Sequence, residues 1–310
     1  MEVLSFDAYS PKEIAAKIEA GGVAKARLPL VAMAMLGLTG GGFIGLGALY
    51  YTVLVSDPSL SFATSRVLGG VAFSLGLILV VVAGAELFTG NNLLVMAWAD
   101  GQITRGEVLR NWIVVYVANA FGAVGLAVVV YLSKHGEMNH GAVAAQYVKI
   151  AAAKTALPFL EAFLKGVLCN LLVCLAVWIA MAGRGVADKI LAIVFPISAF
   201  VAAGFEHCVA NMYFIPLGIF LSGGGPGSPD WRGFAANMLP VTLGNVVGGS
   251  IMVAAVYYLL YNRALKVPGR GVSTADAAGC PARGVEARLT PPSPPGPLSP
   301  SSRTPPRADR

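Results

Sequence analysis

Long uncharged runs separated by short polar segments dominate the pattern of hydrophobic and polar positions along the chain. Six of these runs are near or above the roughly 17 to 25 residues that a helix needs to cross about 30 Å of hydrocarbon. They are Leu28–Ser56, Val67–Ala85, Asn111–Ser133, Gly166–Gly183, Ile190–Phe205 and Gly233–Asn262. The pattern therefore predicts an all-α, polytopic membrane protein with six transmembrane helices.

Two of the predicted spans continue past a polar break. Leu87–Ala99 extends the second run and Cys208–Pro229 extends the short fifth run, in each case without a charged residue. We therefore expect helices 2 and 5 to be long helices that are broken at Glu86 and at Glu206 with His207. An ionisable side chain at membrane depth costs at least about 2.5 kcal/mol on insertion scales, so it usually faces protein or a wet cavity. The two breaks are the candidate functional sites.

The sequences of the two breaks are similar. GAELFTGN at 84–91 aligns with GFEHCVAN at 204–211 at a constant offset of 120, and YVANAFGAVG echoes VTLGNVVGGS in the third span of each half. The aligned polar residues are Glu86 with Glu206, Asn91 with Asn211, and Asn119 with Asn245. Since three spans per half is an odd number, we expect a 3+3 inverted repeat, as in many transport proteins. Chance similarity of short glycine-rich strings is the alternative.

The repeated polar residues and the single histidine suggest different roles. Paired glutamates and asparagines suit the bracing of a loop, because backbone groups freed at a helix break need partners in lipid, although Glu86 and Glu206 could also transfer protons. His207 has no counterpart, because Leu87 occupies the equivalent position. Histidine is the side chain that most easily exchanges a proton near neutrality, so His207 could hydrogen-bond a small anion or protonate it. A structural histidine braced by a neighbouring carboxylate is the alternative.

The composition and the charge distribution agree with a membrane protein. Of the 310 residues, 56% are hydrophobic and 12% are charged, about half the charged fraction of a soluble domain. The first 27 residues lack an apolar signal core, and residues 11–20 predict an amphipathic helix. With both termini in the cytoplasm, sixteen Lys and Arg residues fall on the inner side and five, Lys154 among them, fall in outer loops. The positive-inside rule therefore favours a multi-pass protein with both termini cytoplasmic, and we expect its location to be the inner membrane of a cell.

The domain organisation has three parts, namely a cytoplasmic segment at 1–27, a transmembrane domain at 28–265 and a tail at 266–310. Residues 263–310 hold eight basic and three acidic residues, so most of the formal net charge of +6 belongs to the tail and does not indicate nucleic acid as a partner. The richness of the tail in Pro and Ser predicts disorder, with a partner-binding polyproline segment as the alternative.

The four cysteines predict buried thiols rather than a disulfide framework. Cys169, Cys174 and Cys208 lie in predicted membrane segments and Cys280 lies in the tail. Residues five apart project about 140° apart on a helix, so Cys169 and Cys174 make a poor metal site. We expect no metal and no cofactor.

Four motifs in a fixed order give the chain a likeness to a known family. GAELFTGN, KGVLCNLLVCLAVW, GFEHCVANM and LGNVVGG resemble the formate/nitrite transporter family, over about residues 10–265. The resemblance implies an aquaporin-like fold, a homopentamer in the lipid bilayer with one pore per subunit, and transport of a small monovalent anion with or without a proton. It favours formate, with nitrite as the alternative, and leaves hydrosulfide, acetate and lactate open.

The resemblance also implies a role for individual residues. The polar contacts of the pore would be His207, Thr89 and Asn170. The hydrophobic constrictions would be Phe73, Leu77, Phe88, Val173 and Phe200, although apolar residues of this kind can also be ordinary packing residues. Lys25 at the inner mouth and Lys154 at the outer mouth would attract anions.

Two other classes of function remain to be compared with transport. A membrane-embedded enzyme needs paired catalytic groups or metal ligands on facing helices, and one membrane histidine with two symmetry-related glutamates makes a poor active site. A structural or receptor role would leave the two polar helix breaks unexplained. We therefore expect a channel or transporter and not an enzyme.

Overall fold

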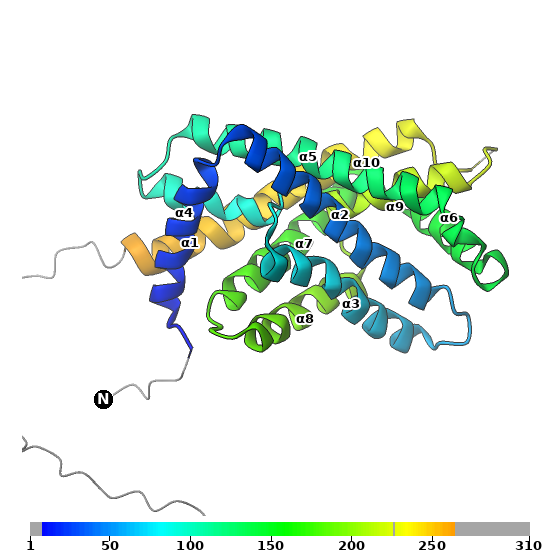
Figure 1. Cartoon of the computed structure of the whole chain (residues 1–310), viewed down its shortest axis with the longest axis horizontal. Coiled ribbons are helices and arrows are strands. Elements are labelled where there is room, and N and C mark those ends of the chain that lie inside the picture. The colour runs from blue at the N-terminus through cyan, green and yellow to red at the C-terminus, as the bar shows by residue number, and fades with distance from the viewer. Residues whose placement is uncertain (1–7, 226, 264–310) are drawn as a thin grey trace, which may run out of the picture. The chain divides into compact units, whose positions relative to one another are not determined.

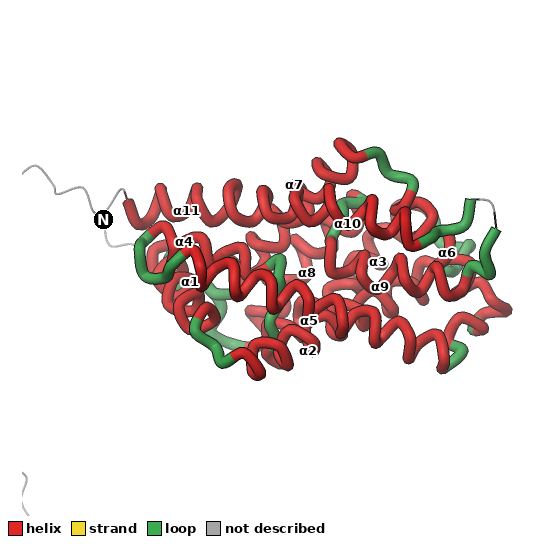
Figure 2. Tube along the Cα trace, turned by 90° about the horizontal axis from the view of Figure 1, so that it is seen from above, coloured by secondary structure: helices red, strands yellow, loops and turns green. Residues whose placement is uncertain are grey.

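The computed structural model describes residues 8–225 and 227–263, and all regular secondary structure in these ranges is helical (Figures 1 and 2). Six helices are long and apolar enough to cross a membrane, which confirms the six predicted spans. They run over Leu30–Val55, Phe62–Gly84, Arg105–Leu132, Phe159–Ala180, Val186–Ala203 and Trp231–Tyr261. The predicted disordered tail at 266–310, with Cys280, lies outside the described residues.

The spans are assembled from α-helices and from shorter 3₁₀ and π segments. The α-helices are α1 (Pro11–Ala26), α2 (Leu30–Val55), α3 (Phe62–Ile78), α4 (Leu94–Ala99), α5 (Arg105–Leu132), α6 (Ala142–Thr155), α7 (Phe159–Ala180), α8 (Val186–Ala203), α9 (Cys208–Leu221), α10 (Trp231–Val246) and α11 (Val256–Tyr258). The 3₁₀ segments are η2 (Gly90–Leu93), η3 (His135–Glu137) and η4 (Asn139–Gly141), and the π segments are η1 (Leu79–Gly84), η5 (Val247–Ala255) and η6 (Leu259–Arg263). The predicted amphipathic helix is therefore present and extends further than residue 20.

Both predicted helix breaks are present, and each begins at a glycine. The second span ends at Gly84, with a φ of 90°, and the chain becomes helical again at Gly90. The fifth span ends at Gly204, with a φ of 75°, and α9 begins at Cys208. Only glycine adopts this left-handed backbone without steric cost, which explains why the two aligned motifs start with the same residue.

The packing of the helices follows the inverted repeat. In the first half α2 packs on α5 and α1 packs on α4, and in the second half α7 packs on α10 and α6 packs on α9. At the junction of the halves, α3 and α8 lie side by side (Figure 1). Each half therefore contains five helical elements in the same order, with α6 equivalent to the amphipathic helix α1.

Helix α6 corrects one detail of the sequence analysis, which placed Lys154 in an outer loop. Lys154 instead lies in the last turn of α6. The helix is only 14 residues long and contains two lysines, so it carries no signal of a membrane span. Its position is set by packing against α9 rather than by hydropathy.

Glycines allow the paired helices of each half to approach closely. A Cβ atom on Gly41 of α2 would collide with the backbone carbonyl of Asn119 on α5, and one on Gly248 of η5 would collide with the carbonyl of Val167 on α7. Such close approach of backbones is the usual role of small residues at helix interfaces in membranes. The α2–α5 and α7–α10 pairs are therefore closely packed, and they hold the two breaks in position.

The alanine substitution Gly41→Ala tests this packing. We expect it to destabilise the folded protein by about 1–3 kcal/mol, because the new methyl group has no space beside the carbonyl of Asn119. The control Gly42→Ala lies one residue away, where a Cβ meets nothing within 4 Å, and should be neutral or slightly stabilising. Thermal unfolding in detergent measures both variants, and equal stability of the two would contradict the packing argument.

Candidate functional site

The two helix breaks meet in the interior through one pair of side chains. The Oγ1 atom of Thr89, in the first break, lies 3.0 Å from the Nε2 atom of His207, in the second break. Thr89 is fully buried and His207 is 3% exposed. The structure thus brings together the threonine and the histidine that the family resemblance singled out.

The hydrogen bonds of His207 define its tautomer. Its Nδ1 atom accepts a hydrogen bond from the backbone N–H of Ala210 at 3.1 Å, so the imidazole caps the N-terminus of α9. Because Nδ1 uses its lone pair in this bond, the proton of the neutral ring is on Nε2, and this N–H donates to the hydroxyl oxygen of Thr89. Protonation of Nδ1 would break the cap and place a positive charge at the positive end of the helix dipole. The geometry therefore favours a neutral imidazole.

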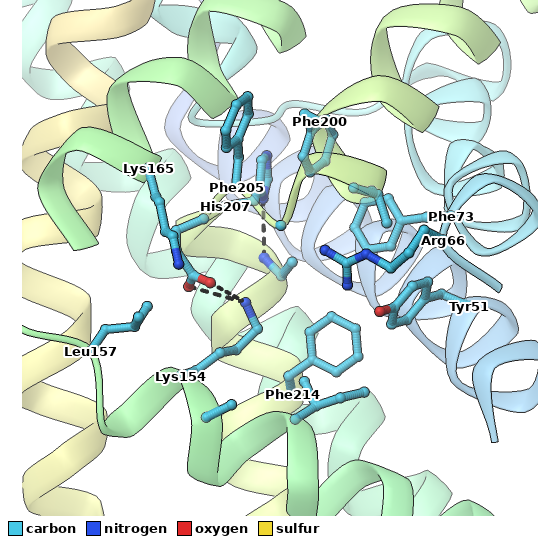
Figure 3. Close-up of a pocket in the computed structure, with 16 residues that line it drawn as sticks. Tyr51, Arg66, Phe73, Lys154, Leu157, Lys165, Phe200, Phe205, His207 and Phe214 are labelled. Carbon is cyan, nitrogen blue, oxygen red and sulfur yellow. Dashed lines mark hydrogen bonds and ion pairs between the residues drawn. The ribbon is translucent and has the colours of Figure 1, made fainter. Parts of the chain in front are cut away.

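Three cavities lie in sequence across the two breaks. We call the first the Lys154 cavity; it has a volume of about 270 Å³ and is shown in Figure 3. The second, the Lys25 cavity, has a volume of about 500 Å³. Between them lies the central gap, of about 10 Å³, which is close to the smallest space that holds one water molecule.

The walls that separate these cavities are apolar apart from His207. Phe73, Phe200 and His207 line both the Lys154 cavity and the central gap. Leu77 and Leu87 line both the central gap and the Lys25 cavity. The two phenylalanine rings are 5.7 Å apart in an edge-to-face arrangement. The central gap is therefore closed by an aromatic constriction on one side and an aliphatic one on the other, and His207 is the one ionisable group in its lining.

The structure places most, but not all, of the predicted constriction residues around the central gap. Phe73, Leu77, Val173 and Phe200 line it. Phe88 lines none of the three cavities, because its ring packs against Tyr116 and Trp112 with centroid separations of 4.9 and 6.2 Å. The preceding residue, Leu87, points into the pathway instead. In a non-helical segment adjacent side chains point in different directions, so the motif alone could not distinguish Leu87 from Phe88.

Two lining residues of the central gap carried no sequence signal. Ile44 on α2 and Ile197 on α8 complete its apolar wall and are almost fully buried. Both lie in uncharged helices among many similar residues, so nothing in the sequence pattern separates them from ordinary packing residues.

Asn170 holds the first break in place and does not line any of the three cavities. Its Nδ2 atom lies 3.2 Å from the carbonyl oxygen of Thr89 and 2.7 Å from that of Asn245. It also donates to the side chain of Asn92 at 3.0 Å. The thiol of Cys174, one turn further along α7, reaches the same Thr89 carbonyl at 3.4 Å. The asparagine that was predicted to line the pore therefore contacts the backbone of Thr89 instead.

A network of polar side chains braces the first break. Glu86 is 5% exposed, and its carboxylate accepts from the Lys25 ammonium at 2.7 Å and from the Asn91 side chain at 2.6 Å. Asn91 also donates to Asn111 at 2.9 Å, and Asn111 donates to the carbonyl of Lys25. Asn119 donates to the backbone carbonyl of Glu86 at 2.9 Å. These side chains thus provide partners for both the carboxylate and the backbone carbonyl of Glu86.

The same network recurs at the second break. Glu206 accepts from Lys154 at 2.9 and 3.0 Å and from Asn211 at 2.7 Å. Asn211 donates to Asn237, Asn237 donates to the carbonyl of Lys154, and Asn245 donates to the carbonyl of Glu206. The main bonds of the first network therefore recur in the second, with one difference. Lys25 also donates to the side-chain oxygen of Asn91 at 3.1 Å, whereas Lys154 donates to both oxygens of Glu206 and the side-chain oxygen of Asn211 has no hydrogen-bond partner in the described part of the chain. These contacts support the bracing role of both glutamates.

The two predicted lysines line the cavities but are not free charges. Lys25 lines the Lys25 cavity and Lys154 lines the Lys154 cavity. Each forms a short ion pair with the glutamate of its own break, Lys25 with Glu86 and Lys154 with Glu206. Because a buried carboxylate offsets the charge of each ammonium, the attraction of either lysine for an anion is reduced. Sequence reasoning missed this, because the partners are 61 and 52 residues apart.

The described residues contain no group of three or more His, Cys, Asp or Glu side chains that could hold a metal ion. Cys169, Cys174 and Cys208 are buried free thiols, as the sequence analysis predicted.

Comparison with known proteins gives consistent matches. The family model described as formate/nitrite transporter matches residues 12–259. The formate channel FocA of Escherichia coli strain K12 is 37% identical over 276 residues, covering 83% of this chain and 96% of that protein. The uncharacterized transporter YrhG of Bacillus subtilis is 41% identical over 258 residues, covering 82% of this chain and 94% of that protein.

Two solved structures have the same fold. One is described as a pentameric formate channel with formate bound, with a TM-score of 0.70 and 36% identity, covering 75% of this chain and 97% of that chain. The other is described as an ion channel of the FNT family, with a TM-score of 0.72 and 31% identity, covering 80% of this chain and 98% of that chain.

The bracing networks predict that equivalent asparagines contribute equally to stability. Asn119→Ala and Asn245→Ala should each destabilise the protein by about 1–3 kcal/mol or more, because each leaves buried backbone groups of a break without a partner. The control Thr39→Ala removes a hydroxyl that bonds only to Met35 of its own helix and should have little effect. A large loss in one half only, measured by thermal unfolding, would show that the networks are not equivalent.

Proposed function

The chain belongs to the formate/nitrite transporter family, and we propose that it carries small monovalent anions, formate in preference to nitrite, along the pathway between the Lys154 and Lys25 cavities. It is a multi-pass membrane protein of a transport family and not an enzyme. The observation that carries the proposal is the succession of cavity, apolar constriction, small central gap, apolar constriction and cavity. His207 lines the central gap, and Thr89, which lines none of the three cavities, is bonded to it from behind.

The proposed orientation puts both termini in the cytoplasm of a cell with an inner membrane. Ile14 and Ile18 of α1 pack in one cluster with Tyr257 and Tyr261 at the end of the last span, so the two ends of the transmembrane domain lie on the same side. The excess of Lys and Arg on this side supports its cytoplasmic location. The Lys25 cavity then opens to the cytoplasm and the Lys154 cavity opens to the outside.

We propose a homopentamer for the assembled protein. The solved channel described above is pentameric, and it matches this chain over most of its length. Large apolar side chains such as Val31, Ile113 and Phe121 are exposed on the single chain and need either lipid or a neighbouring subunit to cover them. Each subunit contains its own complete set of cavities, so each would have its own pore.

The dimensions of the pathway limit what can cross. The central gap is too small for an ion with its hydration shell, and its apolar lining opposes a bare charge. His207 is the hydrogen-bond donor at this point, and an anion that enters the gap would take over the Nε2–H bond now made to Thr89. Of the two roles considered for the histidine, the capped and neutral imidazole supports hydrogen bonding to the anion rather than donation of a proton. The proton that crosses with the anion would then come from the water outside the gap and not from His207. An oxygen of the neutral acid would accept the Nε2–H bond inside the gap.

Substitutions at His207 separate the two roles. Gln places an amide donor near the position of Nε2 but loses the cap, whereas Asn keeps a cap on Ala210 but does not reach Thr89. If hydrogen bonding is what matters, His207→Gln should lose less formate flux than His207→Asn and His207→Phe, which should lose roughly 10- to 100-fold. All transporting variants should retain the increase of flux at lower pH.

The readout for the His207 variants is formate uptake into proteoliposomes between pH 5 and 8. A His207→Gln variant as inactive as His207→Phe, or an active one whose flux no longer depends on pH, would instead favour protonation of the anion by the imidazole.

The choice of substrate is tested by comparing anions in the same proteoliposomes. We expect rapid entry of formate and slower entry of nitrite, because the similar channels are formate channels. Entry of acetate and lactate should be slower still, because these larger anions need a wider opening of the 10 Å³ gap. Uptake without chemical change supports transport. Faster entry of nitrite than of formate would assign the chain to nitrite, and chemical conversion or the absence of any flux would contradict the proposal.

A further inference from the structure

The charges on the wall of the Lys154 cavity are not equivalent. Lys154 is paired with both oxygens of Glu206, and the Lys165 ammonium lies 2.7 Å from Glu161. Arg66, on α3, lines the same cavity and has no carboxylate partner within residues 8–225 and 227–263. The positive charge that is not offset therefore belongs to Arg66, one of the five basic residues that the charge count assigned to outer loops.

The backbone of the second break holds the Arg66 side chain in place. Its Nε–H donates to the carbonyl oxygen of Ala202 at 2.8 Å, at the C-terminal end of α8. The guanidinium lies against Gly204, where a Cβ atom would be only 2.7 Å from Nη2. Figure 3 shows the side chain reaching from α3 toward Lys154, between Phe73 and Tyr51. The guanidinium, which is a planar fork of N–H donors, is thus fixed at the entrance to the aromatic constriction.

Two features make this position suitable for an anion. The bond to Ala202 covers a carbonyl at the negative end of the α8 dipole, which would otherwise repel an anion in the cavity. Of the five N–H donors of an arginine, this bond uses one, and the phenol of Tyr51 also interacts with the guanidinium. The remaining donors on the two Nη atoms can bind an oxyanion. The planar fork of the guanidinium can donate two parallel hydrogen bonds to two oxygens on one atom, and the ammonium of a lysine cannot.

We propose that Arg66 forms an oxyanion-binding subsite in the Lys154 cavity, which captures a small anion with two oxygens on one atom before it passes Phe73 and Phe200. This inference rests on the proposed transport function and adds a residue that determines selectivity. The Lys25 cavity has no arginine in its lining, and its basic residues are Lys17 and Lys25. The two mouths therefore differ, with a planar fork at one and point charges at the other.

Substitution of Arg66 tests the subsite through the concentration dependence of transport. We expect Arg66→Gln to raise the half-saturation concentration of formate, added at low ionic strength on the side of the Lys154 cavity, roughly tenfold, with a smaller effect on the maximal rate. The control Lys149→Gln removes the same charge from an exposed position of α6 outside the cavity and should change it less than about twofold.

Arg66→Lys separates the shape of the fork from its charge. The lysine keeps the positive charge and one donor for Ala202 but cannot hold two oxygens in one plane. We expect this variant to retain part of the attraction for anions and to lose most of the preference for formate over chloride, measured as inhibition of formate uptake by external chloride. If Arg66→Gln does not fold, this second variant decides the test.

Three results would overturn the subsite. An unchanged half-saturation concentration in Arg66→Gln, with or without lower thermal stability, would leave Arg66 only as a cap of α8. An equal shift in Arg66→Gln and Lys149→Gln would reduce its role to general electrostatics, and an unchanged preference over chloride in Arg66→Lys would remove the role of the fork. Failure of the wild-type protein to carry formate or nitrite would refute the transport function itself, whereas transport by the wild type that these variants do not alter would refute only the subsite.

Discussion

The structure depends on the satisfaction of backbone polar groups where two helices break inside the membrane. Lipid offers no hydrogen bonds, so a break is stable only if protein groups replace the lost helical partners. Here one asparagine of the following long helix, Asn119 or Asn245, donates to the glutamate carbonyl and accepts from a backbone N–H two residues later. The glutamate carboxylate, paired with a lysine, fixes the rest of the loop. Without these contacts the Thr89–His207 pair would have no fixed position.

The two breaks are braced by equivalent contacts, but they differ in the residue that each contributes to the central gap. At one equivalent position the first half has Leu87 and the second has His207, and both line the central gap. The aliphatic residue excludes water, while the imidazole supplies the one ionisable group at the narrowest point of the pathway. The bond from the Ala210 N–H to Nδ1 ties this imidazole to the N-terminus of α9.

The basic residues also fall into two groups, those that hold the breaks in place and one that faces the Lys154 cavity. Lys25 and Lys154 help to hold the breaks in place, since each pairs with a buried carboxylate whose charge would otherwise cost much free energy in the membrane. Arg66 lies outside the repeat of paired charges and is held by a backbone carbonyl, which leaves its charge directed to the cavity. A lysine that lines a cavity is therefore not by itself evidence that the cavity attracts anions. Its ion pairs determine how much of its charge acts on the cavity.

The sequence by itself determined the six spans, the two breaks, the inverted repeat and the paired Glu86 and Glu206, because hydropathy and a constant offset are local properties of the chain. The tertiary structure alone decided that Leu87 and not Phe88 faces the pathway, and that Asn170 holds Thr89 rather than lining a cavity. It also decided that residues 142–155 form a helix. Among the three basic residues that line the Lys154 cavity, it showed that Arg66 is the one without a carboxylate partner in the described residues. These properties depend on side-chain direction in non-periodic segments and on ion pairs between residues distant in sequence, and neither leaves a regular pattern in the order of the residues.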